Sequence, residues 1–180
     1  MLKKIFILLS FFPFQLLLAQ SSQLTDFPEG YTPEEVGKRL AYRFVDGKHA
    51  LHARKWISYP ETFNWNGALQ LAKITKDKKL FKLLENKFQP LFTTEKELLP
   101  IMNHVDLNMF GSLPLNLYQM TKKNKYLELG LPYADTQWQV PENAKPAEKE
   151  WADKGYSWQT RLWIDDMYMI TIVQTQAYKV

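Results

Sequence analysis

One segment decides the fold because it occurs twice. Asn64-Trp65-Asn66-Gly67-Ala68-Leu69 returns 44 residues later as Asn108-Met109-Phe110-Gly111-Ser112-Leu113, with asparagine, glycine and leucine in the same places. A second block, residues 75–80, returns as residues 121–127 at nearly the same offset. Two matched blocks in one order, with a period in the mid-forties, are typical of a helical hairpin repeated along the chain. The sequence therefore predicts an all-α array of hairpins.

Apolar residues recur at helical spacing through both repeats, which supports this prediction. Asp77 stands in the turn of the first hairpin and is the expected N-cap of its second helix. No run of alternating β-branched residues occurs, so no strand is predicted. Four stripes are expected to face the core: Trp65, Leu69 and Ala72; Leu80, Leu84 and Phe88; Phe110, Leu113 and Leu117; Leu127, Leu131 and Ala134.

Helices are also predicted on both sides of the repeats. Thr32-Pro33-Glu34-Glu35 has the pattern of a capping box with proline at the first helical position, and it opens a helix that runs through Phe44. A long polar segment, residues 141–154, precedes a third unit. The helix of that unit is expected to begin near Asp165 and to continue to Tyr178.

The first nineteen residues have the pattern of a secretory signal. Lys3 and Lys4 precede an apolar run that ends at Ala19. The run is shorter than the roughly 20 residues of a membrane span and contains Pro13, so no stable membrane anchor is expected. We predict a cleaved signal at 1–19, a linker at 20–30, a domain at 31–180, and a periplasmic or secreted location.

The amino-acid composition argues against a nucleic-acid partner and excludes chemistry that depends on cysteine. The 180 residues carry a formal charge of +4, and two of the lysines responsible belong to the signal. The remaining cations gather at helix ends and do not form a stripe with interleaved aromatics, so no nucleic-acid partner is predicted. The chain has no cysteine, which excludes disulfides, thiolate metal sites and a cysteine nucleophile.

Asp106 and Asp165 occupy matching places at the beginnings of helices in the second and third units. If alternate helices run parallel, these two carboxyl groups approach one another, with Trp65 and Trp163 nearby. Each aspartate taken alone is equally well explained as an N-cap. The apolar residues around Asp165 are expected to raise the pKa of its carboxyl, as a general acid requires. Asp166, about 100° around the helix, is expected to be solvated or to cap it.

The aromatic and histidine residues leave two interpretations open. Trp158 and Trp163 lie in or beside a polar loop and are candidate platforms for sugar rings, although tryptophans in a helical protein also serve as core. His104, two residues before Asp106, is placed to reach the same site. His49 and His52 lack metal-ligand spacing, so no metal site is predicted.

Three stretches together resemble the unsaturated uronyl hydrolases: residues 59–67, residues 103–114, and Arg161-Leu162-Trp163-Ile164-Asp165-Asp166-Met167-Tyr168-Met169. More narrowly they resemble glycoside hydrolase family 105, the unsaturated rhamnogalacturonyl hydrolases, with family 88 more distant. The resemblance covers residues 31–180 and implies an (α/α)6 barrel of six helical hairpins. This chain is expected to hold roughly the first half of that barrel.

The resemblance implies a particular reaction. Enzymes of this kind remove a 4,5-unsaturated uronic acid from the non-reducing end of lyase-generated oligosaccharides by hydrating its C4=C5 double bond. Asp165 matches the residue that protonates C4, and Asp106 matches the residue that assists from across the site. No metal or organic cofactor is implied.

The resemblance also implies contacts with the substrate. His104 and Trp65 fall in motifs that border the sugar, and Arg161 offers a planar fork for the substrate carboxylate. The full set of implied substrate-binding residues is His104, Trp65, Arg161, Trp163, Met169 and Trp158.

The length of the chain predicts a fragment, and two other functions remain as alternatives. Six hairpins need about 280 residues, so the chain is expected to be a fragment that is inactive alone and lacks the C-terminal half of the barrel as its partner. An alternative from another class is a non-catalytic helical-repeat module that binds glycan or protein through its aromatic residues. A further alternative is an (α/α)6 glycosidase that acts on saturated sugars.

Overall fold

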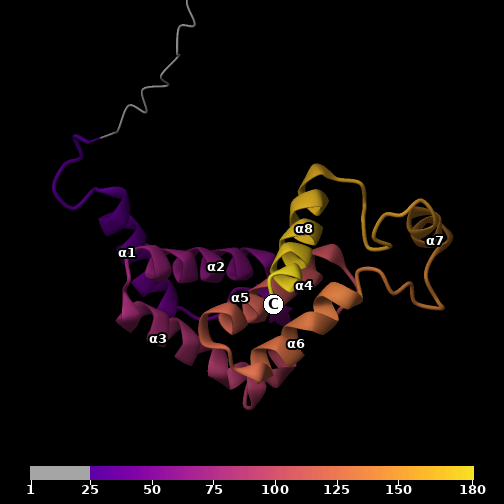
Figure 1. Cartoon of the computed structure of the whole chain (residues 1–180), viewed down its shortest axis with the longest axis horizontal. Helices are drawn as coiled ribbons and strands as arrows, with labels where there is room; N and C mark the ends of the chain where they lie inside the picture. The colour runs from indigo at the N-terminus through magenta and orange to yellow at the C-terminus, as the bar shows by residue number, and fades with distance from the viewer. Residues whose placement is uncertain (1–24) are drawn as a thin grey trace, which may run out of the picture.

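Residues 25–180 are described by a computed structural model (Figure 1). The signal predicted at residues 1–19 lies outside this part of the chain, as do the first residues of the predicted linker. Between residues 25 and 180, no helix is both long enough and apolar enough to cross a bilayer.

Helices make up nearly all the regular structure of the described residues, so the all-α prediction is confirmed. A short pair of two-residue strands, with Leu51 opposite Ile57, was not predicted. The helix α7 was not predicted either, and it forms within the segment described from the sequence only as polar. In chain order the elements are α1 (Pro33–Asp46), β1 (Leu51–His52), β2 (Trp56–Ile57), α2 (Tyr59–Ile74), α3 (Lys78–Phe88), the 3-10 turns η1 (Gln89–Phe92) and η2 (Lys96–Leu98), α4 (Val105–Asn108), η3 (Met109–Gly111), α5 (Ser112–Thr121), α6 (Asn124–Asp135), α7 (Pro146–Asp153) and α8 (Ile164–Tyr178).

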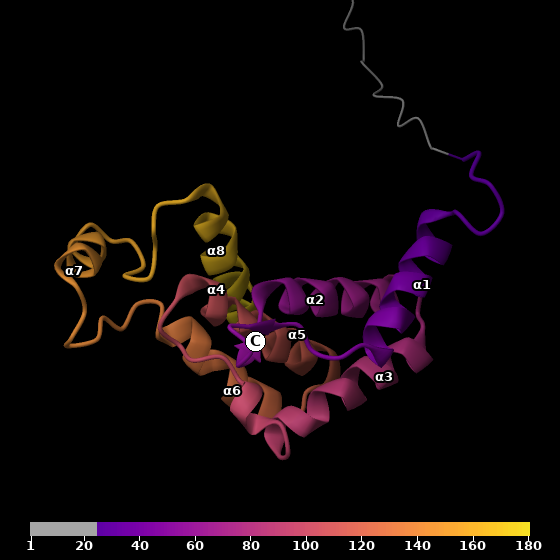
Figure 2. The ribbon, with the colours of Figure 1, turned by 180° about the vertical axis from the view of Figure 1, so that it is seen from behind.

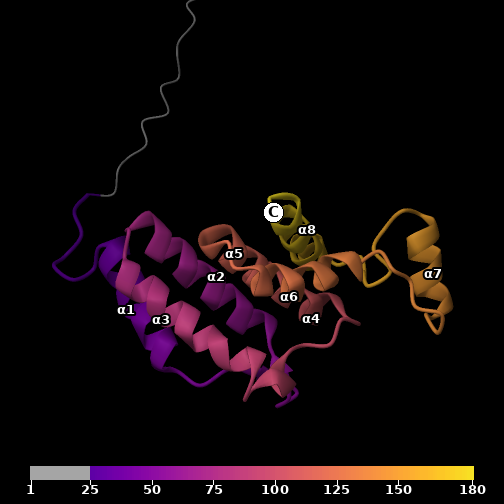
Figure 3. The same cartoon turned by 60° about the horizontal axis from the view of Figure 1, so that its bottom comes forward.

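The two repeats form the predicted hairpins, α2 with α3 and α5 with α6 (Figure 3). Asp77 caps α3 by accepting a hydrogen bond from the Leu80 backbone N–H at 2.9 Å, as predicted. α1 packs against the first hairpin, and α8 packs against α4, α5 and α6. α7 stands apart from these helices on a long connection, which is visible from the front and from behind (Figures 1 and 2).

The hairpins are joined by a polar contact that uses the repeated motif itself. Asn66 in α2 donates a hydrogen bond to the Ser112 hydroxyl at 2.9 Å and accepts one from the Asn116 side chain at 3.1 Å. Ser112 and Asn116 are both buried in α5. Because buried polar groups are costly unless they are paired, this small network fixes how α2 and α5 cross.

Three of the four predicted apolar stripes are buried as expected. The stripe on α6 is confirmed only at Ala134, which is buried. Leu127 and Leu131 are only partly buried, and the buried face carries Tyr126, Gly130 and Tyr133 in their place. Glycine at 130 allows α5 to lie so close that an added Cβ would meet the Leu115 side chain. The close approach therefore selects a face that a hydrophobicity pattern does not identify.

A buried carboxylate ties the first hairpin to the second. Glu85 on α3 accepts hydrogen bonds from the Lys123 ammonium, from the Tyr126 hydroxyl at 3.1 Å and from Lys82 at 3.3 Å. Burial alone would raise the pKa of Glu85, but these donors outweigh burial, and the pKa of its carboxyl lies below the ordinary value.

Glu85 should therefore make stability depend on pH in a defined direction. Because the folded state lowers the pKa of this carboxyl, its stabilisation is complete above the ordinary glutamate pKa and is lost as the pH falls through the folded value. We expect Glu85→Gln to unfold at lower denaturant concentration than wild type at pH 7, with the difference shrinking toward pH 3. Denaturation followed by circular dichroism measures this, with the exposed Glu128→Gln as the control. A difference that stays constant with pH would contradict the assignment.

Candidate active site

The beginnings of α4 and α8 meet, and this places the predicted carboxylates together. Met169 of α8 is buried against Val105 and Met109, which belong to α4 and η3. Asp106 and Asp165 each follow the first residue of their helix, at equivalent positions. Anionic groups are favoured at helix N-termini because the backbone N–H groups there are unpaired. The packing of three apolar side chains thus brings two carboxylates to one end of the molecule.

Arg161 lies at the centre of this cluster. Its guanidinium donates to both oxygens of Asp106, from Nη2 to Oδ1 at 2.9 Å and from Nη1 to Oδ2 at 3.3 Å. The same Nη2 lies 3.8 Å from an oxygen of Asp165. The prediction that Asp106 and Asp165 approach one another is confirmed, because both lie against one cation. Neither caps its helix by hydrogen bonding.

Asp166 is the most buried member of the cluster, with only 1% of its side chain exposed. Its oxygens accept from the Arg161 backbone N–H at 2.6 Å, from Arg161 Nε at 3.0 Å, and from Arg161 Nη2. Burial would raise the pKa of Asp166, but the hydrogen bonds from Arg161 hold it below the ordinary value. The hydrogen bond with Asp166 in turn raises the pKa of Arg161. The expectation that Asp166 is solvated is wrong, whereas the alternative that it caps the helix is confirmed, because its carboxylate accepts a hydrogen bond at 3.4 Å from the backbone N–H of Trp163, the N-cap of α8.

Asp165 has a different environment from the one predicted. Its side chain is 50% exposed, whereas that of Asp106 is 16% exposed. Within residues 25–180, the Asp165 carboxyl accepts no hydrogen bond, and the cation that pairs with it is Arg161, at 3.8 Å. The apolar enclosure expected around Asp165 is not formed by the described residues, because Trp163, Met167 and Tyr156 are themselves exposed.

His104 borders the cluster, as expected from the sequence. Its Nδ1 accepts from the backbone N–H of Asp106 at 3.2 Å and so caps α4. The same nitrogen lies 3.6 Å from the Asp106 carboxylate, and the ring is partly exposed. His104 thus connects the backbone of α4 to the surface beside Asp106.

An apolar groove of about 430 Å³ adjoins the cluster through Trp163 and Thr160. The Arg161 guanidinium lies 4.3 Å from the centre of the Trp163 ring, and the Thr160 hydroxyl donates to Asp166 at 3.4 Å. Trp138 and Tyr156 add two half-exposed aromatic rings to the groove. Exposed aromatic rings beside polar groups suit the flat apolar faces of sugars. Trp138 was not predicted for the site, because it lies 25 residues before Trp163 in the sequence.

Three of the expected substrate-binding residues are buried instead. Trp65 is fully buried in the main core, and its indole N–H donates to the Leu84 carbonyl at 3.3 Å. Trp158 is also buried and donates to the Thr136 carbonyl at 2.7 Å. Met169 packs beneath α4. Their expected placement around a sugar is corrected, because packing occupies these side chains.

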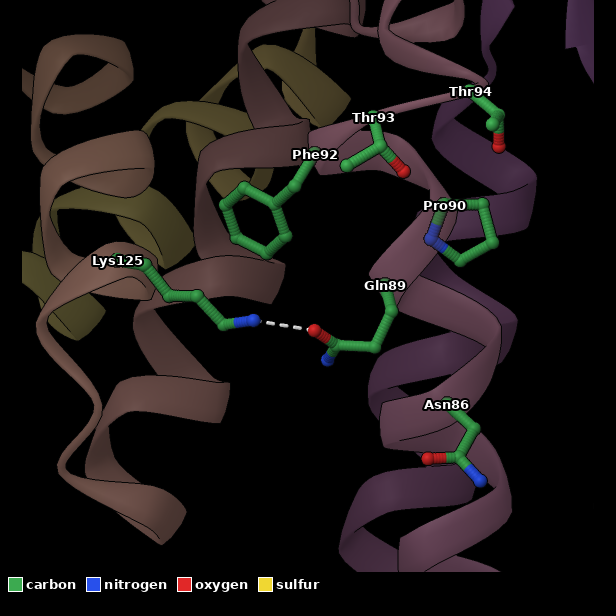
Figure 4. Close-up of a pocket in the computed structure, with 7 residues that line it drawn as sticks. All are labelled: Asn86, Gln89, Pro90, Phe92, Thr93, Thr94 and Lys125. Atoms are coloured by element: carbon green, nitrogen blue, oxygen red, sulfur yellow. Dashed lines mark hydrogen bonds between the residues drawn. The ribbon is translucent and has the colours of Figure 1, made fainter.

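A second hollow, of about 450 Å³, lies between the end of α3 and the beginning of α6 (Figure 4). Gln89 and Lys125 face one another across it and share a hydrogen bond. Phe92 forms part of its wall. No acidic residue lines this hollow, so the acidic cluster at Asp106 and Asp165 remains the candidate for acid–base chemistry.

The fold and the site define a class of protein: an array of helical hairpins that carries carboxyl groups suited to acid–base catalysis beside an aromatic groove. The model of Glycosyl Hydrolase Family 88 matches residues 34–180. The chain belongs to this family and is, at that level, a glycoside hydrolase. Comparisons with curated proteins and with solved structures gave no match.

Proposed function

We propose that the protein removes 4,5-unsaturated uronic acids from oligosaccharides by hydrating the C4=C5 double bond, and that it belongs to the rhamnogalacturonyl branch, family 105. The observation that carries this proposal is the unequal bonding of three carboxyl groups around Arg161. Both oxygens of Asp106 and both oxygens of Asp166 accept hydrogen bonds, whereas Asp165 accepts none among the described residues.

This inequality supports Asp165 as the proton donor. A carboxyl oxygen that already accepts a hydrogen bond from a guanidinium is poorly placed to carry and deliver a proton. Asp165 is free of such bonds and half exposed, so its proton can reach a bound sugar. Family membership and the Trp163-Ile164-Asp165 stretch support the same assignment.

In the proposed reaction, the Asp165 carboxyl donates its proton to C4, and the electron pair of the double bond forms the new C4–H bond. Positive charge develops at C5 and is shared with the ring oxygen. Water adds at C5 and gives up a proton to the Asp165 carboxylate, which restores the acid. The product is a hemiketal that opens and releases the rest of the oligosaccharide. Asp106 assists from across the site.

Negative charge is in excess around Arg161, which supports the use of one carboxyl group of the cluster as an acid. Three carboxyl groups face one guanidinium, and a uronic acid brings a further carboxylate. Like charges at close range disfavour ionisation of the least stabilised member. Of the three carboxyl groups, Asp165 has the fewest contacts with Arg161, which supports its assignment as the acid.

Two further proposals concern the whole protein. Export to the periplasm or the medium is supported by the basic and apolar pattern of residues 3–19. Assembly into a larger helical barrel is supported by apolar side chains that α8 leaves exposed. Ile164 is 89% exposed and Met167 is 68% exposed. Such residues are normally covered by neighbouring helices.

The test of function uses the native gene product and a set of unsaturated disaccharides. We expect the absorbance at 235 nm to fall as the conjugated double bond is consumed, with no release of sugar from matched saturated disaccharides. Hydrolysis of the saturated set would favour a conventional glycosidase. Binding without any loss of absorbance would favour the non-catalytic module.

A further inference from the structure

We infer that Asp166 is a positioning residue for the candidate active site, acting through Arg161 on Asp106 and Asp165. The effect of Asp166 on catalysis rests on the proposed function, in which Asp165 is the acid. Asp166 has no contact with the exposed surface, so it reaches the site only through the residues that it binds.

Asp166 holds the turn that precedes α8. Asp166 accepts hydrogen bonds from the backbone N–H groups of Arg161, at 2.6 Å, and Trp163, at 3.4 Å. Between these two residues, Leu162 has a φ of 59°, in the left-handed region that favours glycine. The Leu162 side chain is exposed. A non-glycine residue persists in this conformation only where its surroundings impose it, and Asp166 binds the backbone on both sides of it.

Asp166 also fixes the direction of the Arg161 guanidinium. Asp166 accepts from Nε and Nη2 on one edge of Arg161, which leaves Nη1 and Nη2 to bind Asp106. A planar guanidinium held by a carboxylate along one edge cannot rotate freely. Asp166 therefore sets the position of the cation that Asp106 binds and Asp165 approaches.

Asp166 further affects the charge around the proposed proton donor, Asp165. Arg161 lies 3.8 Å from Asp165 and connects it to the other charged groups of the cluster. Asp166 and Asp106 both bind the Arg161 guanidinium, and His104 lies beside Asp106. The buried Asp166 carboxylate binds the Arg161 guanidinium and partly neutralises its positive charge. Without that negative charge, the guanidinium would be free to pair with Asp165, which would favour the ionised form and deplete the acid needed for the reaction.

The pH dependence of kcat tests this inference. We expect Asp166→Asn to move the alkaline limb of the kcat profile toward acid by roughly half to one pH unit, because loss of one nearby charge shifts a carboxyl by that order. On that limb kcat would fall about three- to tenfold, with KM changed less than kcat. The control is Asp153→Asn, an exposed aspartate on α7. A lowered melting temperature with an unmoved pH profile would reduce Asp166 to a structural role and overturn the inference.

A second measurement needs no substrate. In the wild-type protein we expect the Arg161 Nε–H to give one slowly exchanging signal by nuclear magnetic resonance, and Asp166→Asn to accelerate that exchange more than tenfold. Rapid exchange in the wild type would overturn the inference even if the variant failed to fold. Failure of the proposed function would appear separately, as a wild-type protein that leaves the 235 nm absorbance unchanged while the Arg161 signal stays protected.

Discussion

Asp165→Asn should lower kcat for unsaturated disaccharides about 10³-fold, because positioned acid–base groups contribute factors of 10² to 10⁴ and an amide cannot supply the proton to C4. KM should change little, since the variant keeps the shape of the side chain. The melting temperature should also stay close to wild type. Asp165 is half exposed, and its 3.8 Å contact with Arg161 is of the exposed kind that contributes little to stability.

The control for this prediction is again Asp153→Asn. It removes an exposed carboxylate at the end of α7, the helix that stands apart from the others. Its kcat should equal that of wild type within twofold. A native gene product in which Asp165→Asn retains full activity would eliminate Asp165 as the acid. Equal losses from both variants would indicate a general effect of charge.

Gly111→Ala should lower the free energy of unfolding by about 3 kcal/mol, at the upper end of the range for overpacked cores. A Cβ at this position would lie 2.3 Å from the Cβ of Tyr133 and 3.3 Å from the carbonyl oxygen of Gly130. Neither atom is the end of a flexible side chain, so α6 would have to move away from η3. Denaturant unfolding of the purified chain measures the loss.

The repeat supplies a matched control, since Gly67 occupies the equivalent place in the first unit. A Cβ there meets no atom within 4 Å. Gly67→Ala should be neutral or stabilise by up to about 1 kcal/mol, because alanine is the better helix former in the middle of α2. If both substitutions had the same effect, the close approach at Gly111 would not be the cause.

These glycines show where sequence reasoning succeeds and where it ends. The matched motifs correctly predicted two hairpins, yet the motifs are alike at Gly67 and Gly111 while the packing differs. In α6, Leu127 and Leu131 were predicted to be buried, but their neighbours Tyr126 and Gly130 are buried in their place for the same reason. The spacing of apolar residues predicts the buried face of a helix from that helix alone. The buried face of α6, however, also depends on how closely α5 packs against it.

The candidate site divides in the same way. The meeting of Asp106 and Asp165 was predicted because both follow helix starts in a repeated unit. Their binding by Arg161 was not, since an arginine near a predicted uronide site was assigned to the substrate. The burial of Asp166 was also missed. An Asp-Asp pair at a helix start with an arginine five residues earlier was the available signal.

The sequence by itself determined the helices of the two hairpins together with α1 and α8, the capping of α1 and α3, the hairpin repeat, and the likeness to a family of glycoside hydrolases. Each of these depends on residues a few positions apart or on motifs that can be matched letter by letter. Only the tertiary structure decided which neighbouring aspartate is buried and which tryptophan faces solvent. Asp165 and Asp166 are chemically identical and adjacent, and they differ only because one side of α8 faces Arg161 and the core. Because of that difference in surroundings, Asp165 is the candidate acid and Asp166 is the proposed positioning residue.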